Sequence, residues 1–205
     1  MAYKYDVFLS YTTKYPHGEW VIDEFFPFFK SFLEDSIGIK NIDIFIDKAE
    51  IKSGNAWEKK ITEALIHSRI MVSVLSPSYF NSDWCKKEFA FMDYRQRKSG
   101  YLSQDNPNGL IVPLKIRDGE HFPDYLKTIQ IANFNNYLRV GEGFRKTPLY
   151  VEFQGKLQDW VEDVKHAYNL APEWNEDWKH PDWINKAWED LDKLKGSPTK
   201  NHPVL

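Results

Sequence analysis

Four short apolar runs, each followed by a segment in which apolar residues have helical spacing, restrict how this 205-residue chain can fold. Strand and helix patterns that alternate in this way are typical of an α/β protein. They predict a five-stranded, mostly parallel sheet with helices on both faces. The expected strands lie at residues 5–11, 42–47, 70–75, 110–114 and, as a shorter fifth strand, within 131–138.

The helices that connect these strands are indicated by apolar residues at helical spacing. The first covers residues 19–35 and contains Pro27, which should kink or split it. Pro113 argues that the fourth strand ends there or lies at a sheet edge. A short helix or irregular cover is expected at 120–130. One helix follows Gly54 and presents Trp57, Ile61, Ala64, Leu65 and Ser68 on one face, and others are expected at 84–95, 149–170 and 182–195.

Glu88 lies where the helix over residues 84–95 should be buried. On a helical projection it falls inside an apolar arc formed by Trp84, Cys85, Phe89, Phe91 and Met92. The opposite arc holds Lys86, Lys87, Ala90, Asp93 and Tyr94. A buried carboxylate is costly unless it is paired or used. Glu88 is therefore either held by a cation or by backbone N–H groups, or it is a functional group. Arg95 is two turns away, roughly 10 Å along the axis, and is not a direct partner.

The position of this helix also bears on function. In parallel α/β sheets, ligands bind beyond the carboxyl ends of the strands. Here those ends are Ser10-Tyr11, Asp47 and the segment around Ser76-Pro77, and the helix of Glu88 begins at the same edge.

Composition narrows the class of protein. A net charge of −3 and a sequence pI of about 6.1 give no electrostatic case for binding nucleic acid. The single cysteine excludes an intramolecular disulfide and fits a reducing compartment. No apolar run approaches the roughly 20 residues that a transmembrane helix needs, and the N-terminus lacks a signal-peptide pattern. We therefore expect a cytoplasmic protein with no membrane partner.

The tryptophans indicate a division of the chain. Five of the eight lie after residue 159. We predict one domain over residues 1–170 and a Trp-rich helical extension over 171–205 that packs on it and ends in a loose tail. Trp174, Trp178, Trp183 and Trp188 are four or five residues apart. They form either a helical flap docked on the domain or a surface for self-association or a partner.

Three segments, in order, resemble the sequence boxes of the TIR (Toll/interleukin-1 receptor) domain. Residues 5–11, Tyr-Asp-Val-Phe-Leu-Ser-Tyr, are similar to the first box, and residues 44–54 are similar to the second, which leads into the BB loop. Residues 75–88 resemble the third conserved strand and the W-C-x-x-E helix of TIR proteins that consume NAD. The resemblance covers about residues 3–170 and implies a flavodoxin-like TIR fold. It does not include the Trp-rich extension.

The resemblance also implies roles for individual residues. Glu88 matches the catalytic glutamate of the enzymatic branch, and Trp84 matches the tryptophan one turn earlier. Some family members carry basic residues where this chain has Thr12 and Thr13, so Lys14 or Lys52 is a candidate to contact the pyrophosphate. The residues expected to bind NAD⁺ are Phe8, Ser10, Tyr11, Thr12, Thr13, Asp47, Lys52, Gly54, Trp57 and Trp84.

One carboxylate is enough for the implied reaction. Nicotinamide leaves NAD⁺ as a neutral base from a cationic pyridinium, so no general acid is needed, unlike ordinary glycoside hydrolysis. A glutamate in a dry pocket can hold the ribose hydroxyls and stabilise an oxocarbenium-like transition state. We therefore expect an NAD⁺ glycohydrolase or ADP-ribosyl cyclase with no metal and no cofactor, NAD⁺ being the substrate. The product could be ADP-ribose, a cyclic isomer or a conjugate.

The resemblance also extends to biological role. A compact TIR protein resembles the signal-making subunit of Thoeris anti-phage systems, whose nucleotide product activates a separate effector. Expected partners are therefore NAD⁺, other TIR copies that engage through the BB loop, and a downstream effector. A non-catalytic TIR adaptor is the alternative, and a deoxyribosyltransferase-like enzyme is a third, weaker hypothesis.

Two other groups of residues have simpler explanations than chemistry. Asp43 and Asp47 share one face of a strand but lie roughly 13 Å apart, which disfavours a metal site. Cys85 has no base paired with it by any motif and is expected to pack as a small hydrophobic residue.

Overall fold

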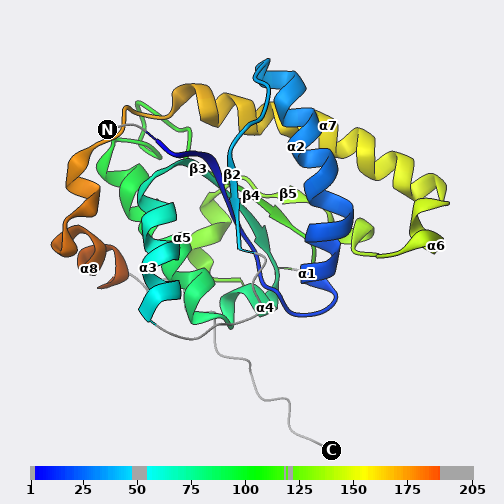
Figure 1. Cartoon of the computed structure of the whole chain (residues 1–205), viewed down its shortest axis with the longest axis horizontal. Helices are drawn as coiled ribbons and strands as arrows, with labels where there is room; N and C mark the ends of the chain where they lie inside the picture. The colour runs from blue at the N-terminus through cyan, green and yellow to red at the C-terminus, as the bar shows by residue number, and fades with distance from the viewer. Residues whose placement is uncertain (1–2, 48–54, 118, 120–121, 190–205) are drawn as a thin grey trace, which may run out of the picture.

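The computed structural model describes residues 3–47, 55–117, 119 and 122–189. Within these ranges one five-stranded sheet has the order β2-β1-β3-β4-β5, and all four neighbouring pairs are parallel (Figure 1). This confirms the predicted fold class. The strands are β1 (Tyr5–Ser10), β2 (Ile44–Ile46), β3 (Ser68–Leu75), β4 (Ile111–Lys115) and β5 (Ala132–Asn133).

Two layers of helices cover the sheet (Figure 1). On one face, α2 (Phe26–Ile37) and α7 (Pro148–Leu170) pack on Val7 and Leu9 of β1. On the other face, α3 (Asn55–Ile66) and α5 (Asp83–Lys98) pack on Phe8. Because side chains alternate along a strand, Ser10 lies on the same face as Phe8. The last residue of β1 is thereby directed towards α5, the helix that carries Glu88.

The first helical segment changes its hydrogen-bonding pattern where a proline interrupts it. A short helix α1 (His17–Glu19) leads into a π-helix η1 (Trp20–Phe25), and α2 begins at Phe26. Pro27 occupies the first turn of α2, where a backbone N–H is not required. The predicted split at Pro27 is thus a change from π-helix to α-helix.

Pro113 lies within β4, between β3 and β5, so the prediction of a strand end or an edge strand was wrong. Leu110 and Ile116 bond to β3, whereas Lys115 accepts from Phe134 on the side of β5. Pro113, two residues before Lys115, therefore directs its ring nitrogen towards β5. The pairing of β4 with β5 begins only at Leu114, so no ladder hydrogen bond needs a donor at Pro113.

Helix α5 is buried on nearly all sides. Ala90 and Asp93, which fall on the arc opposite the apolar one, are only 3% and 5% exposed. The extension supplies the second cover: α8 (Pro181–Glu189) lies along α5, and Trp183 packs at 77° against Tyr94 with ring centroids 5.0 Å apart. A helical projection shows only the apolar arc, not a second layer contributed by a distant segment.

Shorter elements complete the chain. They are α4 (Pro77–Phe80), η2 (Asp124–Thr128), η3 (Asn135–Tyr137), α6 (Glu142–Arg145) and η4 (Glu176–Lys179). The short helix expected near 120–130 is confirmed by η2. Ser68, expected on α3, is instead the first residue of β3. The boundary near residue 170 stays a prediction, and the last part of the helix expected over 182–195 lies outside the described residues.

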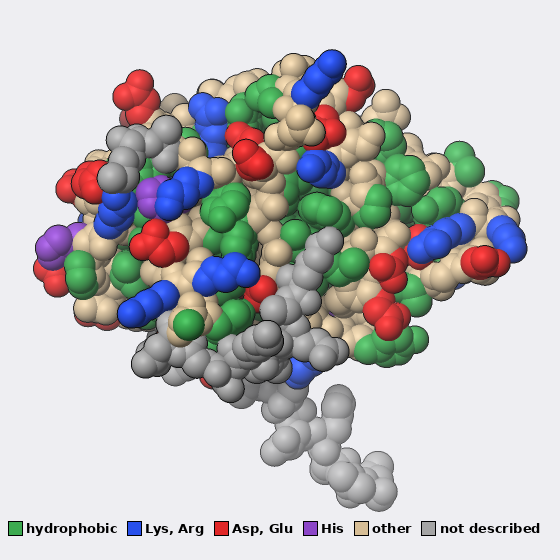
Figure 2. All heavy atoms as spheres, viewed as in Figure 1, with side chains coloured by type: hydrophobic (Ala, Val, Ile, Leu, Met, Phe, Trp, Pro, Cys, Tyr) green, Lys and Arg blue, Asp and Glu red, His purple; other side chains and the backbone are tan. Residues whose placement is uncertain are grey.

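Two expectations concern the charge of the surface and the absence of a transmembrane helix. On the face drawn in Figure 2, basic and acidic side chains are interspersed. Among the helices that the structure describes, none is both long and apolar enough to cross a membrane.

Candidate active site

A cavity of about 330 Å³ opens where β1 ends and α5 begins. This edge holds the carboxyl ends of the strands, where α/β sheets bind ligands. Ser10 does not line the cavity, although it contacts Glu88 directly. Lys52 and Gly54 lie outside the described residues. The predicted site residues that line the cavity are Phe8, Tyr11, Thr12, Thr13, Asp47, Trp57, Trp84 and Glu88.

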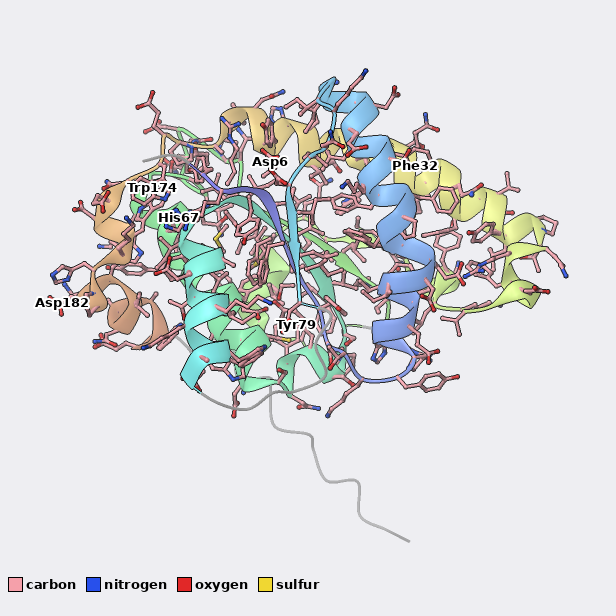
Figure 3. All side chains as sticks on the ribbon, in the orientation of Figure 1. Asp6, Phe32, His67, Tyr79, Trp174 and Asp182 are labelled. Atoms are coloured by element: carbon pink, nitrogen blue, oxygen red, sulfur yellow. The ribbon has the colours of Figure 1, made fainter. Side chains whose placement is uncertain are left out.

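Glu88 is held by a chain of hydroxyl groups from two other elements. Ser10 Oγ donates to Glu88 Oε2 at 2.5 Å, and the Tyr79 hydroxyl lies 2.7 Å from Ser10 Oγ. Because Ser10 gives its single hydroxyl hydrogen to Glu88, Tyr79 is the donor in the second bond. Tyr79 is fully buried near the carboxyl end of the sheet (Figure 3). Its helix α4 is capped by Ser76 Oγ, which accepts from the Tyr79 backbone N–H at 3.2 Å.

The structural explanations for a buried Glu88 do not hold in the described part of the chain. There, no cation and no backbone N–H bonds to its carboxylate, which is 7% exposed. Arg95 instead donates to the carbonyls of Ser68 and Arg69, as expected of a residue that is no partner of Glu88. A buried carboxylate bonded by one hydroxyl is available to interact with a ligand.

Burial raises the pKa of Glu88 to about 8; the Ser10 hydrogen bond opposes this shift, and the charge of Asp47 adds to it. At neutral pH the carboxyl is therefore mostly protonated. A cation that enters the cavity favours the ionised form, because opposite charges a few ångströms apart attract strongly in a site of low dielectric. The site is thus suited to a positively charged ligand.

Two tryptophans from different helices form an aromatic wall. Trp57 of α3 and Trp84 of α5 meet at 86° with ring centroids 4.8 Å apart. The Trp57 indole N–H donates to Asp47 Oδ2 at 2.7 Å, which ties α3 to the end of β2. The wall therefore brings together Asp47 and Trp57, which are ten positions apart, and the more distant Trp84, all three of them predicted site residues. Its rings offer apolar surface for a planar group.

Tyr11 and Cys85 form part of the inner lining. The Tyr11 hydroxyl donates to the Asp47 backbone carbonyl at 2.7 Å. Burial raises the pKa of Tyr11, so its hydroxyl stays protonated as a donor. Burial, together with Glu88, also raises the pKa of the Cys85 thiol, which lies 3.5 Å from the Tyr11 carbonyl oxygen. A protonated, buried thiol agrees with the packing role expected for Cys85.

Several residues at the site were not singled out from the sequence. Glu58, Asn81 and Ser82 line the cavity, as does Lys14, which the sequence offered as a source of positive charge. Ser82 also caps α5, because its Oγ accepts from the Cys85 N–H at 3.3 Å. Tyr79 belongs to the third TIR-like box, but nothing in the local pattern shows that its hydroxyl meets Ser10.

A metal centre was not expected, and the described residues contain no cluster of three or more His, Cys, Asp or Glu that could hold one. Asp43 precedes β2 and Asp47 follows it, so the two residues lie at opposite ends of the strand.

The fold and the site define an α/β protein with a buried carboxylate at the ligand-binding edge of its sheet. Residues 7–147, more than half of the chain, match the TIR domain family. The chain therefore belongs to the TIR domain family, as the sequence boxes predicted.

Several known proteins are similar to parts of this chain. "Probable 2' cyclic ADP-D-ribose synthase BdTIR" of Brachypodium distachyon is 27% identical over 90 residues, which are 43% of this chain and 40% of that protein. The match thus spans about two fifths of the relative's length.

Two solved structures are also similar. The TIR domain of the Toll-related receptor TRR-2 from Hydra magnipapillata has 21% identity and a TM-score of 0.43, covering 75% of this chain and 98% of that one. The TIR domains of the activated Roq1 resistosome directly recognizing the pathogen effector XopQ have 20% identity and a TM-score of 0.38, covering 92% and 99%.

Proposed function

We propose that this protein is an NAD⁺-cleaving TIR enzyme, a glycohydrolase or ADP-ribosyl cyclase, with Glu88 as its catalytic residue. The observation that carries the proposal is the buried Glu88 carboxylate, which is bonded by Ser10 and lies beside an aromatic wall in a cavity at the carboxyl end of the sheet. The similarity to a plant protein named as a cyclic ADP-ribose synthase supports the same class of reaction.

The proposed substrate fits the electrostatics of the cavity. NAD⁺ carries a positive charge on its nicotinamide ring, and a planar cation favours aromatic faces such as those of Trp57 and Trp84. The same positive charge lowers the pKa of Glu88, which burial raises to about 8, so that the carboxyl releases its proton to water. Binding of substrate therefore produces the carboxylate that the reaction needs.

In the proposed reaction the bond between ribose C1′ and the nicotinamide nitrogen breaks. Both electrons of that bond go to the nitrogen, so nicotinamide leaves neutral and the ribose acquires oxocarbenium character. The Glu88 carboxylate stabilises this positive charge, and the limited access of water strengthens the interaction. A nucleophile then bonds to C1′ and loses a proton, for which Glu88 is a suitable acceptor because its pKa lies near the operating pH.

The nucleophile determines the product. Water gives ADP-ribose, whereas an adenine nitrogen or a ribose hydroxyl of the same molecule gives a cyclic isomer. The name of the plant relative supports the cyclic product. We also propose that other TIR copies are partners, and that the product is a signal in anti-phage defence that a separate effector senses. These proposals rest on the TIR resemblance and require no metal or additional cofactor.

The test is to incubate NAD⁺ with concentrated wild-type protein, Glu88→Gln and Glu24→Gln, and to separate the products by chromatography with mass detection. Glu24→Gln is the matched control, because it makes the same change in a fully buried glutamate that does not line the cavity. Nicotinamide released by the wild type and the control, but not by Glu88→Gln, supports the proposal. Equal release by Glu88→Gln contradicts it.

A silent wild type calls for a second experiment, in which the assay is repeated in extract from phage-infected cells. Release that appears only there identifies an enzyme that awaits a trigger and supports the defence role. Continued absence of release contradicts the enzymatic proposal and favours the TIR adaptor.

A further inference from the structure

The C-terminal segment lies beyond the residues that match the TIR family, yet it is attached across the back of α3 and α5. The Trp174 indole N–H donates to the Ile66 carbonyl at 3.1 Å, and its ring stacks on His67 at the end of α3 (Figure 3). Trp178 is 2% exposed and covers the buried guanidinium of Arg95, with the Arg95 carbon 4.5 Å from the ring centroid. These contacts fix the start of α8 relative to α5.

Helix α8 then brings a tryptophan to the outer side of the cavity wall. Trp188 meets Trp84 at 87° with ring centroids 6.4 Å apart. Lys87 Nζ lies 4.5 Å from the Trp84 ring centroid and 4.7 Å from that of Trp188, so one ammonium group contacts both indoles. Trp84 is therefore held from outside by Trp188 and Lys87, and from the other side by Trp57, which is bonded to Asp47.

Trp84 needs such neighbours to keep one orientation. It is the second residue of α5, and its ring is only partly buried. An indole at the start of a helix has few preceding side chains to restrict its rotamers. Edge-to-face contacts with two other indoles and a cation over its face favour the single rotamer in which Trp84 lines the cavity.

We infer that Trp188 and Lys87 are positioning residues, which hold Trp84 as a wall of the cavity. The extension is then a part of the site rather than only a cover for the domain. The consequence for substrate rests on the proposed function: a mobile Trp84 weakens binding of the nicotinamide ring, whereas the charge of Glu88 is unaffected.

The inference is tested with Trp188→Leu and Lys87→Met, which remove the indole and the ammonium but keep apolar bulk. Trp183→Leu is the matched control, because Trp183 is a partly buried tryptophan of the same helix that packs on Tyr94. Circular dichroism and thermal unfolding establish that each variant is folded. The first readout needs no substrate: nuclear Overhauser effects between the Trp84 and Trp57 rings, recorded on protein with labelled tryptophan.

We expect these ring–ring effects to weaken in Trp188→Leu and Lys87→Met and to persist in Trp183→Leu. We also expect the KM for NAD⁺ to rise about three- to tenfold in the first two variants with little change in kcat, as loss of one aromatic or cation–π contact implies. Unchanged Trp84–Trp57 effects in both variants overturn the inference, whatever the protein does with NAD⁺. A wild type that never cleaves NAD⁺ overturns the proposed function instead, and the ring–ring effects still decide the positioning role.

Discussion

Two buried glutamates show that this chain uses buried carboxylates in two different ways. Glu24, in the π-helix before α2, is 0% exposed and accepts from the Gly141 N–H and from Arg145 Nε, each at 3.0 Å. Glu88, in α5, is 7% exposed and accepts from Ser10, with no cation beside it in the described ranges. The carboxylate of Glu24 is paired within the fold, whereas that of Glu88 is open to a ligand.

The two environments differ for a reason that is visible in the fold. Arg145, from a distant segment, forms an ion pair with Glu24 next to α2. A buried carboxylate that is paired in this way has a structural role. Glu88 faces a cavity bounded by aromatic rings and hydroxyls instead. A buried acid with no cationic partner among the described residues has a stability cost, and such costs are common at functional sites.

The largest expected effect separates the two glutamates by activity. Glu88→Gln keeps the shape of the side chain but removes its charge, so we expect NAD⁺ cleavage to fall by a factor on the order of 1,000 or more. Glu24→Gln should stay within about twofold of the wild-type rate, because Glu24 does not line the cavity and its replacement changes no group that contacts the substrate. Initial rates of nicotinamide release measure both. A comparable loss of activity in the two variants would mean that Glu88 has no special role in catalysis, and that the two glutamates differ only in how they affect stability.

The pH dependence of stability sharpens the same comparison. Because the pKa of Glu88 is raised to about 8, the folded state binds a proton that the unfolded state has already released above about pH 4.5. The stability from this group is therefore complete at low pH and is lost as pH rises through 8, at up to about 1.4 kcal/mol per pH unit. Urea unfolding of the wild type between pH 5 and 9 should show this loss, and Glu88→Gln should not. If the free energy of unfolding changed with pH in the same way in both proteins, the raised pKa of Glu88 in the folded state would be contradicted.

Local patterns predicted much of this site. The period of two in β1 directs Ser10 to the face of Phe8, and the helical period places Glu88 within the buried arc of α5. The order of strands and helices predicted that β1, Asp47 and the start of α5 meet at one edge. The resemblance to TIR domains, rather than a local pattern, implied that Tyr11, Thr12, Thr13, Trp57 and Trp84 belong to the site, and all five line the cavity.

What the sequence could not show depends on contacts between distant segments. Ser10 and Tyr79 are 69 positions apart, and only the packing of α4 against β1 brings their hydroxyls together. Ala90 and Asp93 are buried although they lie outside the apolar arc, because α8 and neighbouring segments cover α5. Pro113 is tolerated within the sheet because β5 is only two residues long. None of these three features follows from the periodicity of apolar residues in the sequence.

A smaller effect is expected for the stability of the paired glutamate. Glu24→Gln leaves one acceptor oxygen, now neutral, for one of the two groups that donate to Glu24 and turns an amide N–H₂ group towards the other, so that one hydrogen bond is weakened and one is lost. We expect the free energy of unfolding at pH 7 to fall by about 1–3 kcal/mol. Glu142→Gln is the control, since Glu142 forms an exposed pair with Lys146 and should change stability by no more than about 0.5 kcal/mol. Equal unfolding midpoints for the two variants would show that the pairing of Glu24 contributes little.

The smallest expected effect concerns the donor behind Ser10. The buried Tyr79 hydroxyl polarises Ser10 by donating to it, which strengthens the bond from Ser10 to the Glu88 carboxylate. Burial raises the pKa of Tyr79 well above its usual value, so this hydroxyl stays protonated across the working range. Tyr79→Phe removes the donor with little change in shape. We therefore expect the pKa of Glu88 to rise further and kcat/KM at neutral pH to fall about two- to fivefold.

The pH profile distinguishes this effect from simple damage. If Tyr79 acts through Ser10 on the ionisation of Glu88, the rising limb of kcat/KM in Tyr79→Phe moves to higher pH, and the rate recovers there. Tyr101→Phe is the matched control, because the Tyr101 hydroxyl donates to the Leu170 carbonyl, which belongs to α7. A uniform loss at every pH would assign Tyr79 to packing alone. An unshifted profile at full rate would mean that Ser10 holds the Glu88 carboxylate without help, and that the contrast with Glu24 rests on one hydrogen bond.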